Sequence, residues 1–383
     1  MSEPASESKR ERELMSENEL GFPAGPDALD AGWYTRALRS TGTITDDAEV
    51  VEAEAEQIGV GVGILALLWR VHLTYAPADA GPASAVLKLP HTLAESRHLA
   101  DAFRFYEREV RFYEQAATSS PLRTAARYAS AFDEGGSGDF VLLMEDLGGR
   151  VVHDQLAGCP PEDAERDLRA LAVHHAAWWD STELATFPWA IRVCDPPNPQ
   201  ALVPALRQSW PIIERGFAHV LRGPMLHAAR RLPDVVVPLM ERLSEPPVTL
   251  LHGDHRLDNL LFPTSGDTDD VAVLDWQITG TGRGAYDLAY FLSQSLVPEA
   301  RKGAEHDLVT AYHTTLVEHG VRGYAFGDCW EDYRLATLFV SVYPLNAGSV
   351  DLVNARAVEL FTAMLDRSVS AILDLDALEL LPG

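Results

Sequence analysis

The sequence predicts an α+β fold in two lobes, a small antiparallel β-sheet with one helix and then a larger, mainly helical lobe. The chain has 383 residues, more than one hydrophobic core usually serves. Strand-like segments are concentrated between residues 50 and 145, whereas helical periodicity dominates after residue 150. The expected parts are a disordered arm over residues 1–25, an N-terminal lobe over 26–147 and a C-terminal lobe over 148–383, with Gly148 and Gly149 at the joint.

The N-terminal lobe begins with a segment rich in apolar, β-branched and glycine residues, from Val50 to Leu89. A glycine cluster at 57–64 and the prolines of 77–82 divide this segment into three short strands. A helix is then expected over 95–116, and two more strands over 127–132 and 140–145. The helix is indicated by apolar residues at spacings of three and four, namely Leu99, Phe103, Tyr106, Val110 and Tyr113.

The C-terminal lobe is predicted to be helical apart from one short β interlude. Pro161 suits the first turn of a helix, and the apolar positions that follow it repeat as one stripe. The pair His174 and His175 lies in this helix and is expected to be packed and not catalytic. Strands are expected over 248–251, 259–262 and 271–276, and helices resume over 286–295 and continue to residue 375.

Composition excludes several classes of protein. A net charge of −26 repels phosphate backbones, so nucleic acid is not an expected partner. No apolar run reaches the roughly 18 residues of a membrane-spanning helix, and the N-terminus lacks the apolar centre of a signal peptide. A cytoplasmic protein without a membrane partner is therefore expected. The three cysteines are far apart and fit neither a disulfide framework nor a thiolate zinc site.

The segments His252-Gly-Asp-His-Arg-Leu-Asp-Asn259 and Leu274-Asp-Trp-Gln277 carry the strongest chemical signal. Asp254 lies on a loop between strands, where it could accept a hydrogen bond from a hydroxyl nucleophile. Asn259 offers a neutral oxygen to a metal ion, and Asp275, at the end of the next strand, offers a carboxylate to the same ion. This spacing and order match the catalytic loop and Mg²⁺-binding aspartate of protein kinases, so the pattern predicts phosphoryl transfer.

The N-terminal lobe supplies groups that could hold a nucleotide. Gly59, Gly61 and Gly63 could bring backbone N–H groups close to phosphates. Lys88 lies in the third expected strand, and Glu109 in the following helix could orient it through an ion pair. Glu107 is the competing partner, but it points to a different face of the helix because positions two apart do not share one. We expect Glu109 to be the partner.

The chain resembles the aminoglycoside phosphotransferase and choline kinase-like superfamily, and is most similar to its ecdysteroid-kinase-like and acyl-CoA-dehydrogenase-associated groups. This resemblance implies a protein-kinase-like two-lobed fold that uses ATP and Mg²⁺. It also implies that Asp254 is the catalytic base, Asn259 and Asp275 the metal ligands, and Lys88 the phosphate anchor. By the same resemblance, the backbone of Met144–Leu147, including Glu145 and Leu147, meets adenine. The segments that carry it are Val86–Pro90, Tyr106–Tyr113, Leu142–Leu147, Asp154–Cys159, His252–Asn259, Asp275–Gln277 and Tyr286–Phe291.

Two residues near the proposed base have more specific expectations. Arg256 is either a catalytic contact to the γ-phosphate or a surface arginine, and arginine is a common phosphate ligand. Asp287 resembles a superfamily aspartate that braces the catalytic loop, and we expect a structural role for it.

The acceptor is expected to be a small-molecule alcohol, either an antibiotic, a sterol-like compound or a hydroxy-acyl alcohol. One alternative function is a pseudokinase-like module that binds nucleotide without turnover. A less favoured alternative is a metallohydrolase built on His252, Asp254, His255 and Asp258, which lacks the further ligands that such sites need. A protein kinase is disfavoured because HGD replaces HRD and the D-F-G and A-P-E triplets are missing.

Overall fold

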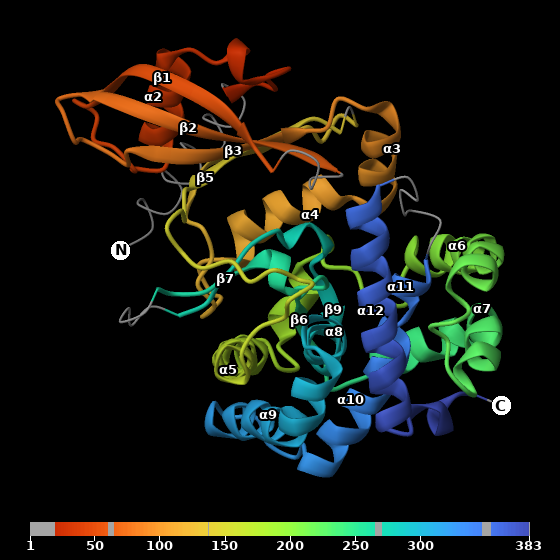
Figure 1. The fold of residues 1–383 in the computed structure, drawn as a ribbon. Coiled ribbons are helices and arrows are strands. Elements are labelled where there is room, and N and C mark those ends of the chain that lie inside the picture. The colour runs from red at the N-terminus through yellow and green to blue at the C-terminus, as the bar shows by residue number, and fades with distance from the viewer. Residues whose placement is uncertain (1–19, 60–64, 137, 265–269, 347–353, 383) are drawn as a thin grey trace. The chain divides into compact units, whose positions relative to one another are not determined.

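The computed structural model describes residues 20–59, 65–136, 138–264, 270–346 and 354–382. The chain forms two compact units (Figure 1). The first comprises residues up to Ser119 together with Thr124–Gly148, and the second comprises Ser120–Arg123 with everything from Gly149 onward. An antiparallel sheet in the first unit and a mainly helical second unit confirm the predicted α+β fold class.

The first unit is built on one five-stranded sheet in the order β1-β2-β3-β5-β4, and every neighbouring pair is antiparallel. Lys88 lies at the centre of this sheet, opposite Leu68 on one side and Leu142 on the other. The five strands were all predicted from the sequence, and their bounds are β1 Glu49–Ile58, β2 Ala66–Ala76, β3 Ser84–Pro90, β4 Arg127–Phe132 and β5 Phe140–Glu145.

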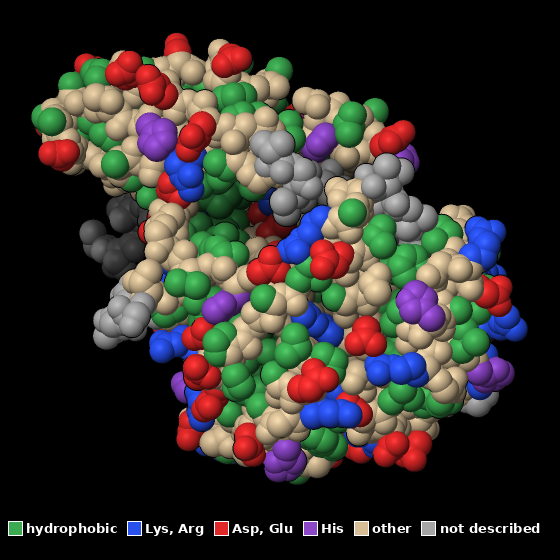
Figure 2. Space-filling model, in the orientation of Figure 1, with side chains coloured by type: hydrophobic (Ala, Val, Ile, Leu, Met, Phe, Trp, Pro, Cys, Tyr) green, Lys and Arg blue, Asp and Glu red, His purple; other side chains and the backbone are tan. Residues whose placement is uncertain are grey.

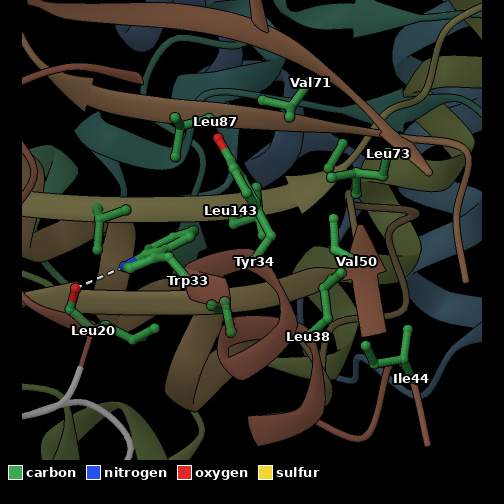
Figure 3. Close-up of a cluster of buried hydrophobic side chains, with 14 of the residues drawn as sticks. Leu20, Trp33, Tyr34, Leu38, Ile44, Val50, Val71, Leu73, Leu87 and Leu143 are labelled. Carbon is green, nitrogen blue, oxygen red and sulfur yellow. Dashed lines mark hydrogen bonds between the residues drawn. The ribbon is translucent and has the colours of Figure 1, made fainter. Parts of the chain in front are cut away.

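Helix α2, Ala31–Ser40, covers one face of the sheet and was not predicted from the sequence. Its first turn is capped by Asp30, whose side chain accepts a hydrogen bond of 2.7 Å from the N–H of Trp33. Figure 3 shows how Trp33, Tyr34 and Leu38 pack into the core beside side chains of the sheet. The sheet residues in this core include Val71, Leu73, Leu87 and Leu143.

The prediction of a single helix over 95–116 is wrong in one respect, because the helix is interrupted at Arg104. Helix α3, Ala94–Phe103, ends there, and α4, Phe105–Arg111, begins, followed by a π-helical turn at Phe112–Ala116. Arg104 has a φ of 57°, in the left-handed region. The break changes which face turns inward, so that Phe105 and Tyr106 are both buried while Leu99 is 42% exposed.

The described part of the second unit consists of helices with two small antiparallel two-stranded sheets, β6 with β9 and β7 with β8. Helix α8 is buried along its whole length, because the helices α10 and α12 pack against it. Strand β9 was not predicted. The bounds are α5 Pro161–Ala177, α6 Asn198–Ile212, α7 Met225–Leu243, β6 Thr249–Leu251, β7 Leu260–Leu261, β8 Ala272–Val273, β9 Gly280–Gly282, α8 Ala285–Ser295, α9 Pro298–Glu318, α10 Phe326–Val340, α11 Val342–Leu345 and α12 Ala355–Asp374.

The four residues Ser120–Arg123 belong to the second unit although β4 and β5 follow them in the chain. Arg123 forms a parallel bridge with Ala272 in β8, and its carbonyl accepts a hydrogen bond of 2.8 Å from the N–H of Val273. The Ser120 hydroxyl lies 2.8 Å from Nδ1 of His174 in α5. These contacts make the tetrapeptide an integral part of the second unit.

Charged side chains of both signs are spread over the face seen in Figure 2. Strand β1, which pairs only with β2 among the described strands, carries Glu52, Glu54 and Glu56 in alternation, all exposed. Such acidic side chains at a sheet edge discourage pairing with another chain. In the described part of the chain, every helix is too short or too polar to cross a membrane.

Candidate active site

The loop from His252 to Asn259 begins directly after β6 and is anchored to helix α8 by Asp287. The Asp287 carboxylate accepts hydrogen bonds from the backbone N–H of His252, at 2.7 Å, and of Gly253, at 2.8 Å. Gly253 has a φ of +88°, and a Cβ there would lie 2.4 Å from the carbonyl oxygen of Ile278. Only glycine fits this position, and the predicted bracing role of Asp287 is confirmed.

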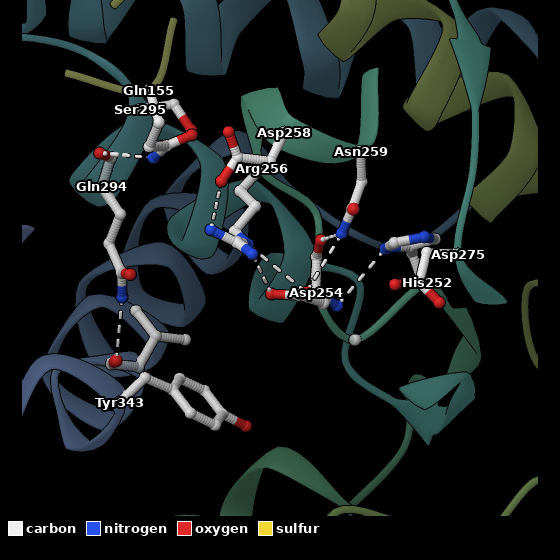
Figure 4. A network of polar contacts seen from close by, with 12 residues as sticks. Gln155, His252, Asp254, Arg256, Asp258, Asn259, Asp275, Gln294, Ser295 and Tyr343 are labelled. Carbon is white, nitrogen blue, oxygen red and sulfur yellow. Dashed lines mark hydrogen bonds and ion pairs between the residues drawn. The ribbon is translucent and has the colours of Figure 1, made fainter. Parts of the chain in front are cut away.

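The carboxylate of Asp254 lies at the centre of a polar network (Figure 4). Nδ2 of Asn259 donates to Asp254 Oδ2 at 3.0 Å and to the Asp254 carbonyl oxygen at 2.8 Å. The Asp254 side chain is 15% exposed, so its carboxylate is held in place and is still accessible. This arrangement leaves room for a carboxylate oxygen to accept a hydrogen bond from an incoming hydroxyl.

The two proposed metal ligands, Asn259 and Asp275, come from adjoining positions of paired strands. The N–H of Leu274 donates to the Asn259 carbonyl at 2.9 Å, and Nε2 of His252 donates to the Leu274 carbonyl at 2.8 Å. These bonds tie the segment that carries Asp275 to the loop that carries Asp254 and Asn259. The sequence prediction that these three side chains come from one strand–loop–hairpin arrangement agrees with these contacts.

The oxygen atoms near Asp275 fit a hard cation. Asp275 has a φ of 63°, and Gln277 Nε2 donates to its Oδ2 at 3.3 Å. Oε1 of Gln277 is buried and has no hydrogen-bond partner among the described residues. Because Nδ2 of Asn259 is engaged with Asp254, its Oδ1 is the atom left to face a ligand. Carboxylate and amide oxygens are the ligands that Mg²⁺ takes in proteins.

Arg256 is held inside the loop and does not behave as an ordinary surface arginine. Its Nη1 lies 2.5 Å from Asp258, its Nε lies 3.3 Å from Asp254, and the side chain is 23% exposed. Burial acts to lower the pKa of this guanidinium, but the carboxylates of Asp254 and Asp258 raise it above its usual value. Arg256 therefore places a permanent positive charge beside the proposed base.

Tyr290 is a neighbour of Asp254 that the sequence analysis did not single out. It follows Asp287 by three residues in α8, so both side chains lie on one face of the helix. The pKa of Tyr290 is raised well above its usual value, mainly by burial and secondly by the nearby Asp254 carboxylate. The spacing of three between the two residues is the sequence signal that could have identified it.

In the first unit, Lys88 and Glu109 form a buried ion pair. The distances from Lys88 Nζ to the two Glu109 oxygens are 2.8 and 2.7 Å, and the side chains are 7% and 1% exposed. Glu107 instead pairs with Arg104 on a more exposed face, at 2.7 Å. The prediction that Glu109 and not Glu107 pairs with Lys88 is confirmed.

The other residues expected to contact nucleotide also belong to the first unit. Gly59 directly follows β1 with a φ of +64°, a conformation that favours glycine. Gly61 and Gly63 lie outside the described residues. Glu145 ends β5, where its Oε2 accepts a hydrogen bond of 3.0 Å from the N–H of Ala126, and Leu147 follows it half-buried.

The histidines of the loop make contacts that do not suit a metallohydrolase. Nε2 of His252 donates to a carbonyl, its Nδ1 accepts from the N–H of Asp254 at 3.3 Å, and Nε2 of His255 lies 2.9 Å from Asp167. Within the described residues, no group of three His, Cys, Asp or Glu side chains is placed to hold a metal ion. His174 and His175 are fully buried, as predicted for packed residues.

Comparisons with known proteins identify relatives of this chain. The family model described as "Phosphotransferase enzyme family" matches residues 71–327. Acyl-CoA dehydrogenase family member 10 of Mus musculus is 31% identical over 132 residues, a match that covers 28% of this chain and only 12% of the mouse protein.

Solved structures with similar folds were also found. A Ralstonia eutropha protein assigned to the aminoglycoside phosphotransferases has a TM-score of 0.54 and 15% identity, with 91% of this chain and 98% of that chain covered. At this level of identity the likeness shows the fold alone. The ethanolamine kinase of Plasmodium vivax has a TM-score of 0.49 and 13% identity, with 98% and 94% covered.

Proposed function

The chain belongs to the phosphotransferase enzyme family, and we propose that it transfers the γ-phosphate of ATP to a hydroxyl of a small molecule with the help of Mg²⁺. The observation that carries this proposal is the Asp254 network. A partly exposed carboxylate is fixed by Asn259 and lies in a loop tied to the segment of Asp275. Phosphoryl transfer requires mainly positioning and charge stabilisation, which such a rigid polar loop can supply.

In this proposal Asp254 accepts a hydrogen bond from the acceptor hydroxyl, orients its oxygen and takes up the proton as the reaction proceeds. Arg256, whose charge is fixed by its carboxylate neighbours, contacts the transferred phosphate. Tyr290 limits the movement of the Asp254 side chain from the side of α8.

Asn259 and Asp275 would hold the metal ion, and Lys88 would hold the phosphates of the nucleotide, oriented by Glu109. When bound, Mg²⁺ neutralises negative charge on phosphate oxygens. The buried Oε1 of Gln277, which has no hydrogen-bond partner in the described part of the chain, supports an oxygen-lined cation site beside Asp275. Gly59, Gly61, Gly63, Glu145 and Leu147 are proposed to contact the nucleotide through their backbone.

The two parts of the chain would divide these tasks. We propose that residues 26–147 bind the nucleotide and that residues 148–383 carry catalysis and acceptor binding. The acceptor would be an alcohol such as an antibiotic, a sterol-like compound or a hydroxy-acyl alcohol.

The test is the release of ADP from ATP and Mg²⁺, measured with aminoglycosides, sterols, hydroxy-acyl compounds, choline and sugars as acceptors. One or more acceptors should raise the rate in the wild type, and Asp254→Asn should abolish that increase. Nucleotide binding by calorimetry without any accelerated release would favour the pseudokinase-like module. Absence of Mg²⁺-dependent nucleotide binding would refute the proposal.

A further inference from the structure

Helix α5 presents three buried polar side chains to the β6 strand, the loop that follows it and helix α8. Asp167, His174 and His175 lie at spacings of seven and eight residues, which places them on one face of the helix. Nε2 of His174 lies 3.0 Å from the Leu250 carbonyl oxygen, and Nε2 of His175 lies 3.2 Å from Asp287. Asp167 contacts the loop itself, because it pairs with His255.

The contact between His255 and Asp167 is close and completely buried. Nε2 of His255 lies 3.1 and 2.9 Å from the two Asp167 oxygens, and both side chains have no exposed surface. The His255 ring packs edge-on against His252, with centroids 5.6 Å apart, and lies 5.9 Å from the ring of Phe291. Nδ1 of His255 has no hydrogen-bond partner among the described residues. Among the described residues, the ring is thus oriented by one polar contact, the one to Asp167.

Stability alone does not explain this pair. Burial acts to lower the pKa of His255, but the carboxylates of Asp167 and, secondarily, Asp287 raise it, which favours the charged imidazolium. Removing two charges from water is costly, and well-packed apolar side chains of similar volume are often as stabilising as a buried ion pair. The pair also leaves one ring nitrogen unsatisfied, which carries a further cost.

His255 follows Asp254 directly in the chain, so any rotation of the backbone at this point moves both side chains. Asp287 already holds the N–H groups of His252 and Gly253, on the N-terminal side of Asp254. A contact from His255 to α5 fixes the next residue on the other side.

We propose that His255 and Asp167 are positioning residues that lock the loop around Asp254 to helix α5, so that the carboxylate of Asp254 keeps the orientation needed for phosphoryl transfer. This inference rests on the catalytic role proposed above for Asp254.

Four variants test the proposal. Asp167→Leu/His255→Phe replaces the pair by apolar side chains, and Asp167→Asn removes only the charge of the carboxylate. His255→Gln keeps an N–H donor that can reach Asp167. Glu165→Gln is the matched control, because it makes the same type of change on the same helix in an exposed pair with Arg169.

The first measurement is hydrogen–deuterium exchange of the peptide that covers residues 252–259, together with the melting temperature. The apolar double variant should melt close to the wild type but exchange roughly tenfold faster in this peptide, because the loop opens locally. Asp167→Asn should also speed exchange in this peptide. The exchange rate of His255→Gln should lie nearer that of the wild type, and the rate of Glu165→Gln should equal the wild-type rate. Exchange within twofold of the wild type in the apolar variant would overturn the proposal, as would faster exchange spread over the whole chain.

The second measurement is the rate of ADP release from ATP and Mg²⁺ with water as the acceptor. The apolar variant should lose roughly 10- to 100-fold in kcat, the effect of a displaced catalytic group, with KM for ATP unchanged. A rise in KM with constant kcat would contradict a role at Asp254. If the wild type releases no ADP with water or with any acceptor of the screen described above, the proposed phosphotransfer fails, and the exchange measurement still decides whether the pair holds the loop.

Discussion

Asp254 is the residue on which the proposed chemistry depends most directly. Asn259 and Arg256 both contact its carboxylate, so its orientation is fixed before any acceptor arrives. A carboxylate held in this way can act as proton acceptor without reorganising during the reaction.

Asp254→Asn should lower kcat by about 10²–10⁴-fold, the usual contribution of a general base. The amide keeps an oxygen that can accept from Asn259, so the loop should persist and the melting temperature should change little. Calorimetry should give a nucleotide Kd close to that of the wild type, because Asp254 faces the acceptor in the proposed reaction. Asp234→Asn, in an exposed pair with Arg207, is the control. Near-normal turnover of Asp254→Asn would exclude the catalytic assignment.

Asp275→Asn should act through the metal ion. The change removes the negative charge of a proposed Mg²⁺ ligand, so activity should need much higher Mg²⁺ concentrations, and Asn259→Ala should show a milder form of the same effect. Titrating Mg²⁺ and Mn²⁺ in the ADP-release assay measures this requirement. If Asp275→Asn has the Mg²⁺ dependence of the wild type, Asp275 does not bind the metal.

At the scale of elements, helix α8 supports the loop around Asp254 from within the core. Asp287 holds the loop backbone, and Tyr290, one turn later, stands beside the carboxylate of Asp254. Asp287 is fully buried, and His175 adds a third hydrogen bond to it. Burial acts to raise the pKa of Asp287, but the hydrogen bond and charge of His175 lower it to about 2.

The Asp287 carboxylate should therefore make stability depend on pH at the acid end. Its pKa is about 2 in the folded protein, against 3.8 for an unperturbed aspartate. Above pH 4 the ionised Asp287 carboxylate contributes about 2 kcal/mol to the free energy of unfolding. This contribution is lost as the pH falls from about 4 to 2. Urea unfolding of the wild type and Asp287→Asn from pH 6 to 2.5 measures this. The difference in unfolding free energy should shrink by most of that amount over this range, and a constant difference would contradict the assignment.

The sequence predicts elements well where the signal is local. The strands of the first unit follow from β-branched runs separated by glycine and proline, and the Asp254–Asn259–Asp275 arrangement follows from short spacings around one hairpin. The break at Arg104 could not be predicted, because arginine has no preference for positive φ and burial of Phe105 and Tyr106 decides it.

Other features depend on contacts between distant parts of the chain. Strand β9 is Gly-Thr-Gly, in which two of three residues are the glycine that strands disfavour, and it forms because β6 provides its hydrogen-bonding partner. The pair of His255 with Asp167 joins residues 88 positions apart. No periodic pattern or short motif encodes such a contact.

At the scale of the whole molecule, the residues proposed to hold phosphate and those proposed to perform chemistry belong to different compact units. Lys88 and Glu109 lie in the sheet and helix of the first unit, whereas Asp254 and Asp275 lie in the second. Binding and turnover should therefore be separable by mutation.

Lys88→Met/Glu109→Gln should weaken nucleotide binding by roughly tenfold or more, because the cation proposed to face the phosphates is lost. The double change avoids leaving Glu109 as an unpaired buried charge, which alone would destabilise the fold by about 3–5 kcal/mol. Calorimetry with an ATP analogue and Mg²⁺ measures the Kd, and Lys302→Ala on the surface is the control. Equal nucleotide affinity in the double variant and the wild type would remove Lys88 from the nucleotide site.

The tetrapeptide Ser120–Arg123 constrains how the two units can be exchanged between related proteins. A chimera that takes only residues 149–383 from this chain would separate the Arg123 carbonyl from the N–H of Val273, and the Ser120 hydroxyl from His174. A single crossover in the gene therefore cannot transplant the second unit intact. A functional graft, natural or engineered, must carry two discontinuous stretches of coding sequence across together.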